Sequence, residues 1–203
     1  MEYTAQEICD ALHLDLSEIV NIYPYGSKIY GTADEFSDDD YAIVYKRSLL
    51  PSGSFKDNAI SSDDWKIQGV CYSRGGFIDA INNYQITALE CIFLPDDLVV
   101  QKKMDFPMTK FNKKELAKNI ISTASASWHL AKLSYVDQNP GPAMKNIFHA
   151  IRILEFGLQI KNKGRIVDYG SENRFKEKLY RVGDYNPKTY LSLFMSLQSK
   201  LKE

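Results

Sequence analysis

The sequence predicts an α+β fold, with an α/β N-terminal lobe over residues 1–108 and a helical lobe over residues 109–203. Strand-like and helix-like segments alternate in the first lobe, whereas apolar residues of the second recur at helical spacing. The two halves of the chain also differ in charge. Residues 1–100 hold 6 Lys/Arg and 17 Asp/Glu, whereas residues 101–203 hold 19 Lys/Arg and 9 Asp/Glu. An acidic half suits divalent cations and a basic half suits phosphates, although both patterns are also typical of solvated surfaces.

The N-terminal lobe is predicted to begin with a helix over residues 4–13, because Thr4-Ala5-Gln6-Glu7 is a capping box ahead of apolar residues. Alternation, apolar runs and turn residues predict the elements that follow. In chain order they are a strand over 17–25, a helical turn over 28–32, a strand over 39–45, a polar loop over 46–64, a strand over 65–72, a helix over 76–84, a strand over 86–94 and a short strand over 98–102.

The C-terminal lobe is predicted to contain four helices. The first spans residues 113–136 and ends before the break at Asn139-Pro140-Gly141-Pro142. The second spans residues 143–161 and ends before Gly164. The remaining two are expected over 172–182 and 187–202, and the segment 164–169 is expected to pack back onto the body.

Composition narrows the class of protein. Hydrophobic residues make up 44% of the chain and aromatic residues 12%, which is typical of a folded protein. No apolar run has the length of a membrane span, and the N-terminal residues do not resemble a secretory signal. The three cysteines, Cys9, Cys71 and Cys91, have neither CxxC nor zinc spacing. We therefore expect a cytoplasmic protein with reduced cysteines, no structural zinc and no membrane partner.

Two carboxylates form the first chemical pattern. On a strand, residues i and i+2 point to the same face, so Asp38 and Asp40 are expected to project together while Asp39 points away. Neighbouring carboxylates repel unless a cation lies between them, and Mg²⁺ prefers carboxylate and phosphate oxygens. The pair therefore indicates a metal–nucleotide site, although acidic clusters near loops are usually only solvated.

The second pattern is Gly26-Ser27, which follows a predicted strand. Glycine lets a backbone approach a ligand closely, and a short helix directs amide groups toward an anion. Ser27 adds a hydroxyl donor and Lys28 a positive charge. Each pattern alone is common, whereas a phosphate turn eleven residues before a metal pair is far more specific.

The stretch Tyr25-Gly26-Ser27-Lys28-Ile29-Tyr30-Gly31, followed by Ser37-Asp38-Asp39-Asp40-Tyr41, resembles the signature of polymerase-β-like nucleotidyltransferases. It is most similar to the RNA-repair-associated and minimal nucleotidyltransferases. The resemblance implies a mixed sheet, Mg²⁺ binding by Asp38 and Asp40, and triphosphate binding by Gly26 and Ser27. The chain departs from the pattern at Lys28, where arginine is usual, and at Asp39, where an apolar residue is usual.

The resemblance also implies a third carboxylate on a later strand, and Glu90 is the candidate because it lies among apolar residues. Asp38, Asp40 and Glu90 are thus the predicted catalytic residues and the predicted ligands of two Mg²⁺ ions. A partly exposed strand position or a salt bridge to a lysine would also explain Glu90. Asp79 and the pair Asp63-Asp64 are weaker candidates for the same role.

The helical lobe offers Lys145, His149 and Arg152, which share one helix face. The stripe resembles one in RNA-repair-like relatives, which implies contact with the phosphates of a nucleotide or with the acceptor. A solvated face with one packed histidine is the alternative. His129, next to Trp128, is expected to be structural, and Tyr25 and Tyr30 are expected either to stack on a base or to serve packing alone.

The resulting hypothesis is a Mg²⁺-dependent nucleotidyltransferase that moves a nucleoside monophosphate from a nucleoside triphosphate such as ATP to an acceptor hydroxyl. The expected acceptor is an RNA 3′ end, tRNA-like or broken. A protein side chain, as with antitoxin-type enzymes, or a small molecule such as an aminoglycoside are alternative acceptors. A module that binds nucleotide or nucleic acid without catalysis is the rival from another class. The sequence predicts neither nucleotide preference nor oligomeric state.

Overall fold

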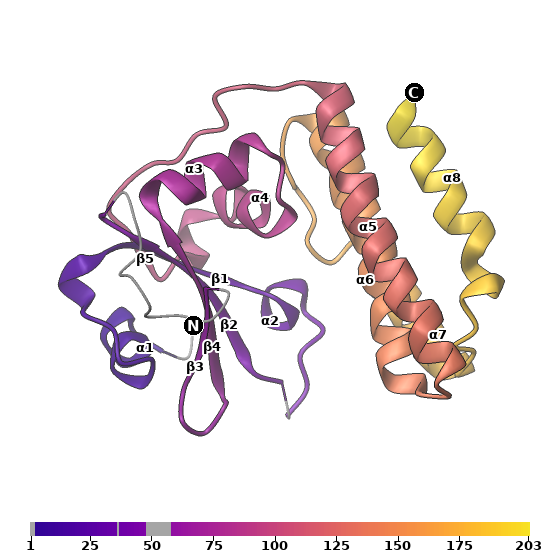
Figure 1. The fold of residues 1–203 in the computed structure, drawn as a ribbon, viewed down its shortest axis with the longest axis horizontal. Coiled ribbons are helices and arrows are strands. Elements are labelled where there is room, and N and C mark those ends of the chain that lie inside the picture. The colour runs from indigo at the N-terminus through magenta and orange to yellow at the C-terminus, as the bar shows by residue number, and fades with distance from the viewer. Residues whose placement is uncertain (1–2, 36, 48–57) are drawn as a thin grey trace. The chain divides into compact units, whose positions relative to one another are not determined.

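The computed structural model describes residues 3–35, 37–47 and 58–203. They belong to two compact units, Met1–Lys110 and Phe111–Glu203. The first unit contains a five-stranded mixed sheet with helices, and the second is helical (Figure 1). The predicted α+β class is therefore confirmed.

The sheet of the N-terminal unit has the strand order β3-β4-β2-β1-β5. Its strands are β1 (Ile19–Tyr25), β2 (Asp39–Tyr45), β3 (Ala59–Ser61), β4 (Ile67–Ser73) and β5 (Gln101–Lys102). The central pair β2 and β4 is parallel, and the other neighbouring strands pair antiparallel. A mixed sheet is what the resemblance implies.

Helices lie against both faces of the sheet. The helices of this unit are α1 (Ala5–Ala11), α2 (Ser27–Tyr30), α3 (Arg74–Asn82) and α4 (Ile86–Phe93), with 3-10 turns η1 (Leu16–Glu18) and η2 (Asp96–Leu98). Successive side chains of a strand point to opposite faces. Ile22 of β1 accordingly packs in the same buried cluster as Ile8 of α1. Its neighbour Tyr23 stacks on Phe77 of α3, with ring centroids 5.7 Å apart.

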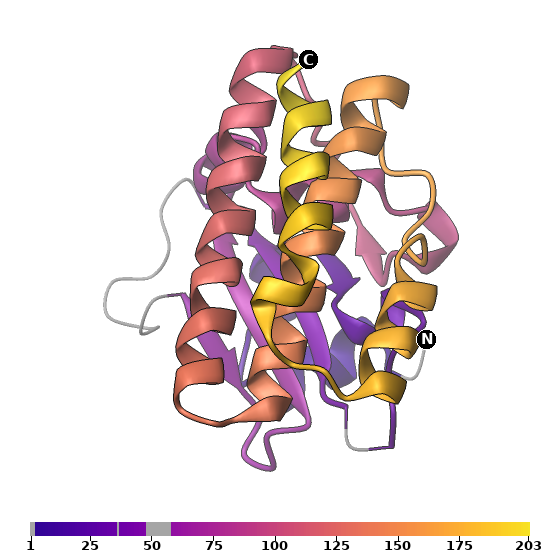
Figure 2. The same cartoon turned by 90° about the vertical axis from the view of Figure 1, so that its right-hand side faces the viewer.

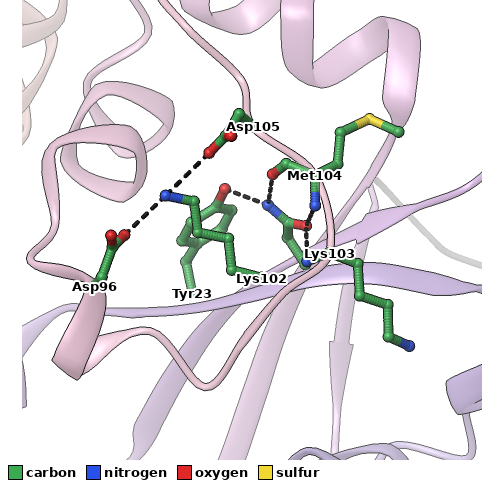
Figure 3. Close-up of polar contacts among 7 residues, drawn as sticks. Tyr23, Asp96, Lys102, Lys103, Met104 and Asp105 are labelled. Atoms are coloured by element: carbon green, nitrogen blue, oxygen red, sulfur yellow. Dashed lines mark hydrogen bonds and ion pairs between the residues drawn. The ribbon is translucent and has the colours of Figure 1, made fainter.

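A buried asparagine ties the edge of the sheet to its centre. The side-chain amide of Asn21 donates to the Tyr23 hydroxyl at 2.5 Å and to the Met104 carbonyl at 2.7 Å (Figure 3). Its oxygen accepts from the backbone N–H groups of Lys103 and Met104, each at 3.1 Å. All donor and acceptor positions of this amide are used, so its burial is compensated. The contacts hold the segment after β5 against β1.

The prediction for residues 86–94 was wrong, because they form helix α4 rather than a strand. An apolar run of this length fits a buried strand and a buried helix equally well. In the structure α4 buries four consecutive residues, Ala88 to Cys91. That burial leaves no polar face for periodicity to detect.

The predicted polar loop over 46–64 was wrong in part, because Ala59–Ser61 forms the edge strand β3. Residues 48–57 of that loop lie outside the described residues. The other elements of the unit were predicted within a few residues, and the strand expected over 98–102 is shortened to β5.

The C-terminal unit contains α5 (Lys113–Val136), α6 (Pro140–Lys163), α7 (Asn173–Val182), η3 (Pro187–Tyr190) and α8 (Leu191–Lys202). Helices α5, α6 and α8 run side by side (Figure 2). Trp128 of α5 stacks on Phe194 of α8 with ring centroids 4.2 Å apart. The predicted helices are confirmed, but α6 begins within the predicted break, because proline suits the first turn of a helix.

The segment that follows α6 packs back onto this unit, as predicted. Ile166 is fully buried. The side-chain oxygen of Gln159 accepts from the backbone N–H groups of Val167 and Asp168, both at 2.9 Å. Among the residues that the structure describes, no helix combines the length and apolar character needed to cross a membrane.

Candidate active site

The turn between β1 and α2 brings the backbone of Gly26 against a carboxylate. Gly26 precedes the first turn of α2 with φ 83° and ψ −159°, a conformation that only glycine adopts readily. A Cβ atom at this position would lie 2.3 Å from Oδ2 of Asp40. Asp40 is the register partner of Tyr25 in the antiparallel pair of β1 and β2, and this pairing holds its carboxylate next to Gly26. The phosphate turn and one carboxylate of the predicted metal pair are thus in direct contact.

The second carboxylate of the pair lies one residue before β2. Asp38 is partly exposed, and the side-chain amide of Gln68 donates to its Oδ2. Gln68 belongs to β4 and is the register partner of Asp40. Gln68 was not among the predicted site residues, because only the parallel pairing of β2 with β4 brings it to this position.

The two departures from the family pattern form an ion pair with each other. The Lys28 ammonium lies 2.6 Å from Oδ2 of Asp39, and the exposed fractions of the two side chains are 34% and 10%. Asp39, which was expected to point away, thus contacts the lysine of the phosphate turn, and Lys28 compensates its burial. The ion pair could have been predicted from the sequence, because both residues depart from the family pattern and carry opposite charges.

Glu90 lies on helix α4 and not on a strand as predicted. It is 4% exposed, and its Oε2 accepts a hydrogen bond from the Tyr30 hydroxyl at 2.5 Å. Burial raises the pKa of Tyr25, and the charges of Asp40 and Glu90 raise it further. The negative charges of both carboxylates therefore act on the Tyr25 hydroxyl. Tyr30 has a defined role here as a hydrogen-bond donor to Glu90.

In the described part of the chain, no group of three or more His, Cys, Asp or Glu side chains is arranged to hold a metal ion. The structure thus brings Asp40 to Gly26 and Glu90 to Tyr30 without assembling a cluster from Asp38, Asp40 and Glu90. Their metal-binding and catalytic roles remain predictions. Of the weaker candidates, Asp79 lies on α3 and Asp63-Asp64 lie in the turn before β4.

A cavity of about 680 Å³ adjoins these residues and is lined by Lys28, Asp38 and Asp39. Further carboxylates in its wall come from Asp34, Glu35 and Asp64. The indole of Trp65 also lines the cavity and is 69% exposed. Trp65 adopts φ 61°, which is rare for a bulky side chain. Trp65 was not among the predicted site residues.

The predicted stripe of the helical unit lies on α6. Nη2 of Arg152 lies 2.9 Å from Nδ1 of His149, and Arg152 is only 5% exposed. Burial lowers the pKa of His149 to about 3, and the charges of Arg152, Lys145 and Lys176 contribute to the shift. Arg152 and His149 thus touch, and Lys145 acts on the same imidazole. His129 is exposed on α5, so its expected packing role was wrong.

Comparison with known proteins adds little. No family model matches the chain, and no curated protein matches it. Among solved structures it is similar to a nucleotidyltransferase-like protein from Exiguobacterium sibiricum 255-15, with 12% identity and a TM-score of 0.33 over 91% of this chain and 69% of that one. A likeness this distant carries no argument, so the function is inferred from the chain's own residues.

Proposed function

We propose that the chain is a Mg²⁺-dependent nucleotidyltransferase that moves a nucleoside monophosphate from a nucleoside triphosphate to an acceptor hydroxyl. The observation that carries the proposal is the direct contact between the Gly26 backbone and the Asp40 carboxylate. A phosphate held by the turn would lie beside a carboxylate that binds cations. Among the described residues, this spatial contact supports the proposal in addition to the sequence spacing of the Gly-Ser and Asp-x-Asp segments.

The residues present suit Mg²⁺ in their donor chemistry. Asp38 and Asp40 offer carboxylate oxygens, the ligands that Mg²⁺ prefers together with substrate phosphates. The missing Cβ of Gly26 lets the Asp40 carboxylate lie against the backbone of the phosphate turn. Glu90, whose Oε2 accepts from the Tyr30 hydroxyl, is the proposed third carboxylate. When bound, Mg²⁺ would neutralise phosphate charge and favour ionisation of the acceptor hydroxyl.

The chain's own residues bind the triphosphate and accept a proton. The amide groups of the turn and the Ser27 hydroxyl donate to phosphate oxygens. The acceptor oxygen forms a bond to the α-phosphorus while the bond from that phosphorus to pyrophosphate breaks. Asp40 accepts the proton of the acceptor hydroxyl, since it is partly exposed whereas Glu90 is buried and hydrogen-bonded.

The acceptor that we propose first is an RNA 3′ hydroxyl, on the resemblance to RNA-repair enzymes and the basic second half of the chain. One observation favours a second acceptor class. Carboxylates dominate the cavity beside Asp38 and Asp39, and Trp65 exposes an aromatic face there. Such a wall repels a polyanion and attracts an organic cation, so a small amine that carries a hydroxyl group is the second candidate.

The test is incubation with each α-³²P-labelled nucleoside triphosphate and Mg²⁺, in one arm with small RNAs and in another with hydroxyl-bearing amines. We expect label on the acceptor with the natural chain and none with the double variant Asp38→Asn/Asp40→Asn. Asp97→Asn, at an exposed position of η2, is the matched control and should retain transfer. Equal labelling by the double variant would refute the proposal.

The label also separates the rival hypotheses. Label on RNA supports the first acceptor, and label on an amine supports the second. Tight nucleotide binding without label on either acceptor class, or on the protein itself, would instead support a module that binds nucleotide without catalysis.

A further inference from the structure

A cavity of about 230 Å³ lies beside the edge strand β5 of the N-terminal unit. Tyr23 of β1, Cys91 of α4 and Lys102 of β5 contribute to its wall. Much of the remaining wall is apolar and consists of Ile92, Leu94, Val99, Phe106 and Pro107. All of these residues belong to the N-terminal unit, and none of them has a role in the proposed transfer.

The Tyr23 hydroxyl is a buried hydrogen-bond donor in this wall. Tyr23 is 3% exposed, and its oxygen accepts a hydrogen bond from the Asn21 side-chain amide (Figure 3). That bond does not use the hydroxyl proton, and no residue that the structure describes accepts it. Burial raises the pKa of Tyr23 to about 12, so the proton stays on the oxygen at neutral pH. A buried donor without an acceptor costs free energy, which a ligand with an acceptor oxygen recovers.

The charged side chains of the wall favour a neutral ligand. The Lys102 ammonium lies 2.8 Å from Oδ1 of Asp96 and 3.1 Å from Oδ1 of Asp105 (Figure 3). Because Lys102 is already paired with two carboxylates, an anionic ligand would gain little from it. A ligand whose only polar group is an ammonium would bring no acceptor for the Tyr23 proton. A neutral oxygen acceptor meets both conditions.

The size of the cavity limits the rest of the ligand. An apolar cavity of roughly 150 Å³ binds benzene, so about 230 Å³ accommodates one ring with a short substituent. Contact of such a ring with Ile92, Leu94 and Phe106 would remove apolar surface from water, which favours binding.

We propose that this cavity binds a small neutral molecule, a single apolar ring with one carbonyl oxygen that accepts the Tyr23 hydroxyl proton. The ring packs against the apolar wall, and Lys102 with its two carboxylates borders the polar side. The site includes neither the phosphate turn nor the Asp-x-Asp segment, so it stands or falls separately from the proposed activity.

The first test titrates the full chain with acetophenone, a neutral ring that carries one carbonyl oxygen, and follows isotope-labelled methyl groups by NMR. We expect the methyl signals of Ile92 and Leu94 to shift with saturation, whereas the signal of Ile147 in the helical unit stays unchanged. Benzoate and benzylamine should bind more weakly than acetophenone. The absence of a saturable shift at Ile92 and Leu94, or tighter binding of either charged ligand, would overturn the proposal.

The second test removes the donor and keeps the ring. Tyr23→Phe should weaken acetophenone binding about fivefold, because one neutral hydrogen bond is lost. The same variant should not weaken the binding of ethylbenzene, a ligand of similar size without an acceptor. Equal weakening for the two ligands would overturn the role of the Tyr23 hydroxyl.

Two tryptophan variants locate the site. Val99→Trp fills the cavity and should abolish the binding of both ligands. Leu98→Trp, at an exposed neighbouring position outside the wall, should leave binding unchanged. Retained binding in Val99→Trp, or equal loss in both variants, would overturn the location. If Val99→Trp does not fold, the Tyr23→Phe comparison and the methyl shifts decide the proposal.

One further arm separates this site from the proposed activity. The Asp38→Asn/Asp40→Asn variant should bind acetophenone as the natural chain does. Loss of binding in that variant would overturn the independence of the two sites.

Discussion

The two units treat charge in different ways, and the N-terminal unit joins opposite charges. Lys28 pairs with the buried Asp39 at 2.6 Å. At the sheet edge the Lys102 ammonium lies between two carboxylates, 2.8 Å from Asp96 and 3.1 Å from Asp105 (Figure 3). Hydrogen bonds with Asp96 and Asp105 raise the pKa of Lys102.

The helical unit instead sets like charges side by side. Cations surround His149. Burial raises the pKa of Glu172 to about 7, and the charges of Glu155 and Asp168 raise it as well. Like-charge groups weaken a fold unless a ligand or a proton intervenes, and they are typical of functional sites. Opposite charges thus lie together in the N-terminal unit, whereas groups of like charge act on one another in the helical unit.

The largest effect is expected from Gly26→Ala. The new Cβ would collide with Asp40, and the backbone would be held where only glycine is unstrained. We expect the free energy of unfolding of the N-terminal unit to fall by about 3 kcal/mol. Gly164→Ala in the helical unit is the matched control: Gly164 also has positive φ, but nothing lies within 4 Å of its Cβ position.

That control should cost its own unit about 1 kcal/mol. Hydrogen exchange of amides in each unit measures both values. Equal losses for the two variants would show that Asp40 does not press on the turn.

The next effect concerns the carboxylates of the helical unit. Because the pKa of Glu172 rises from 4.5 to about 7 on folding, the folded state binds more protons in that interval. Stability should therefore fall as the pH rises from about 4.5 to about 7. Glu172→Gln should remove this fall and stabilise the unit by about 2 kcal/mol at pH 8, after allowance for partial exposure.

Urea unfolding between pH 4 and pH 8 provides the measurement. Glu177→Gln, at an exposed position of α7, should leave the pH profile unchanged. A Glu172→Gln profile parallel to that of the natural chain would show that like-charge repulsion does not act at this position.

A smaller loss is expected when the buried ion pair is broken. Lys28→Met leaves Asp39 without its cation and should destabilise the N-terminal unit by roughly 1–2 kcal/mol. Arg47→Met breaks the pair of Arg47 with Glu18, whose side chains are 63% and 30% exposed. That control should cost at most about 0.5 kcal/mol. Thermal melting at two salt concentrations compares them, and indistinguishable losses would argue against the importance of burial.

The smallest effect is a gain. Trp65 holds φ 61° while 69% of its side chain is exposed. Trp65→Gly should relieve that strain and stabilise the N-terminal unit by about 1 kcal/mol. Chemical unfolding of both chains measures the difference. A less stable variant would mean that the indole contributes packing that outweighs the strain.

Local patterns predicted the parts of the site that are local in the chain. The turn at Gly26 and the strand that begins at Asp39 were both predicted, because glycine chemistry and side-chain alternation act over a few residues. The helix that carries Glu90 was not predicted, since an apolar run of eight residues has no diagnostic period.

Contacts between residues that are distant in sequence could not be predicted from these local patterns. Gln68 meets Asp38 only because β4 lies parallel to β2. Lys176 lies over the ring of Phe148 on α6 only because α7 packs on that helix. Sequence spacing places residues within an element, whereas tertiary packing decides which elements meet.

The two tryptophans have a practical consequence. Trp65 in the N-terminal unit is 69% exposed, whereas Trp128 in the helical unit is 3% exposed and stacked on Phe194. Their fluorescence should therefore differ, with red-shifted, acrylamide-quenchable emission from Trp65 and shielded emission from Trp128. Replacing either one by phenylalanine leaves a single intrinsic reporter in a known unit. The order in which the two units unfold can then be followed optically without any attached dye.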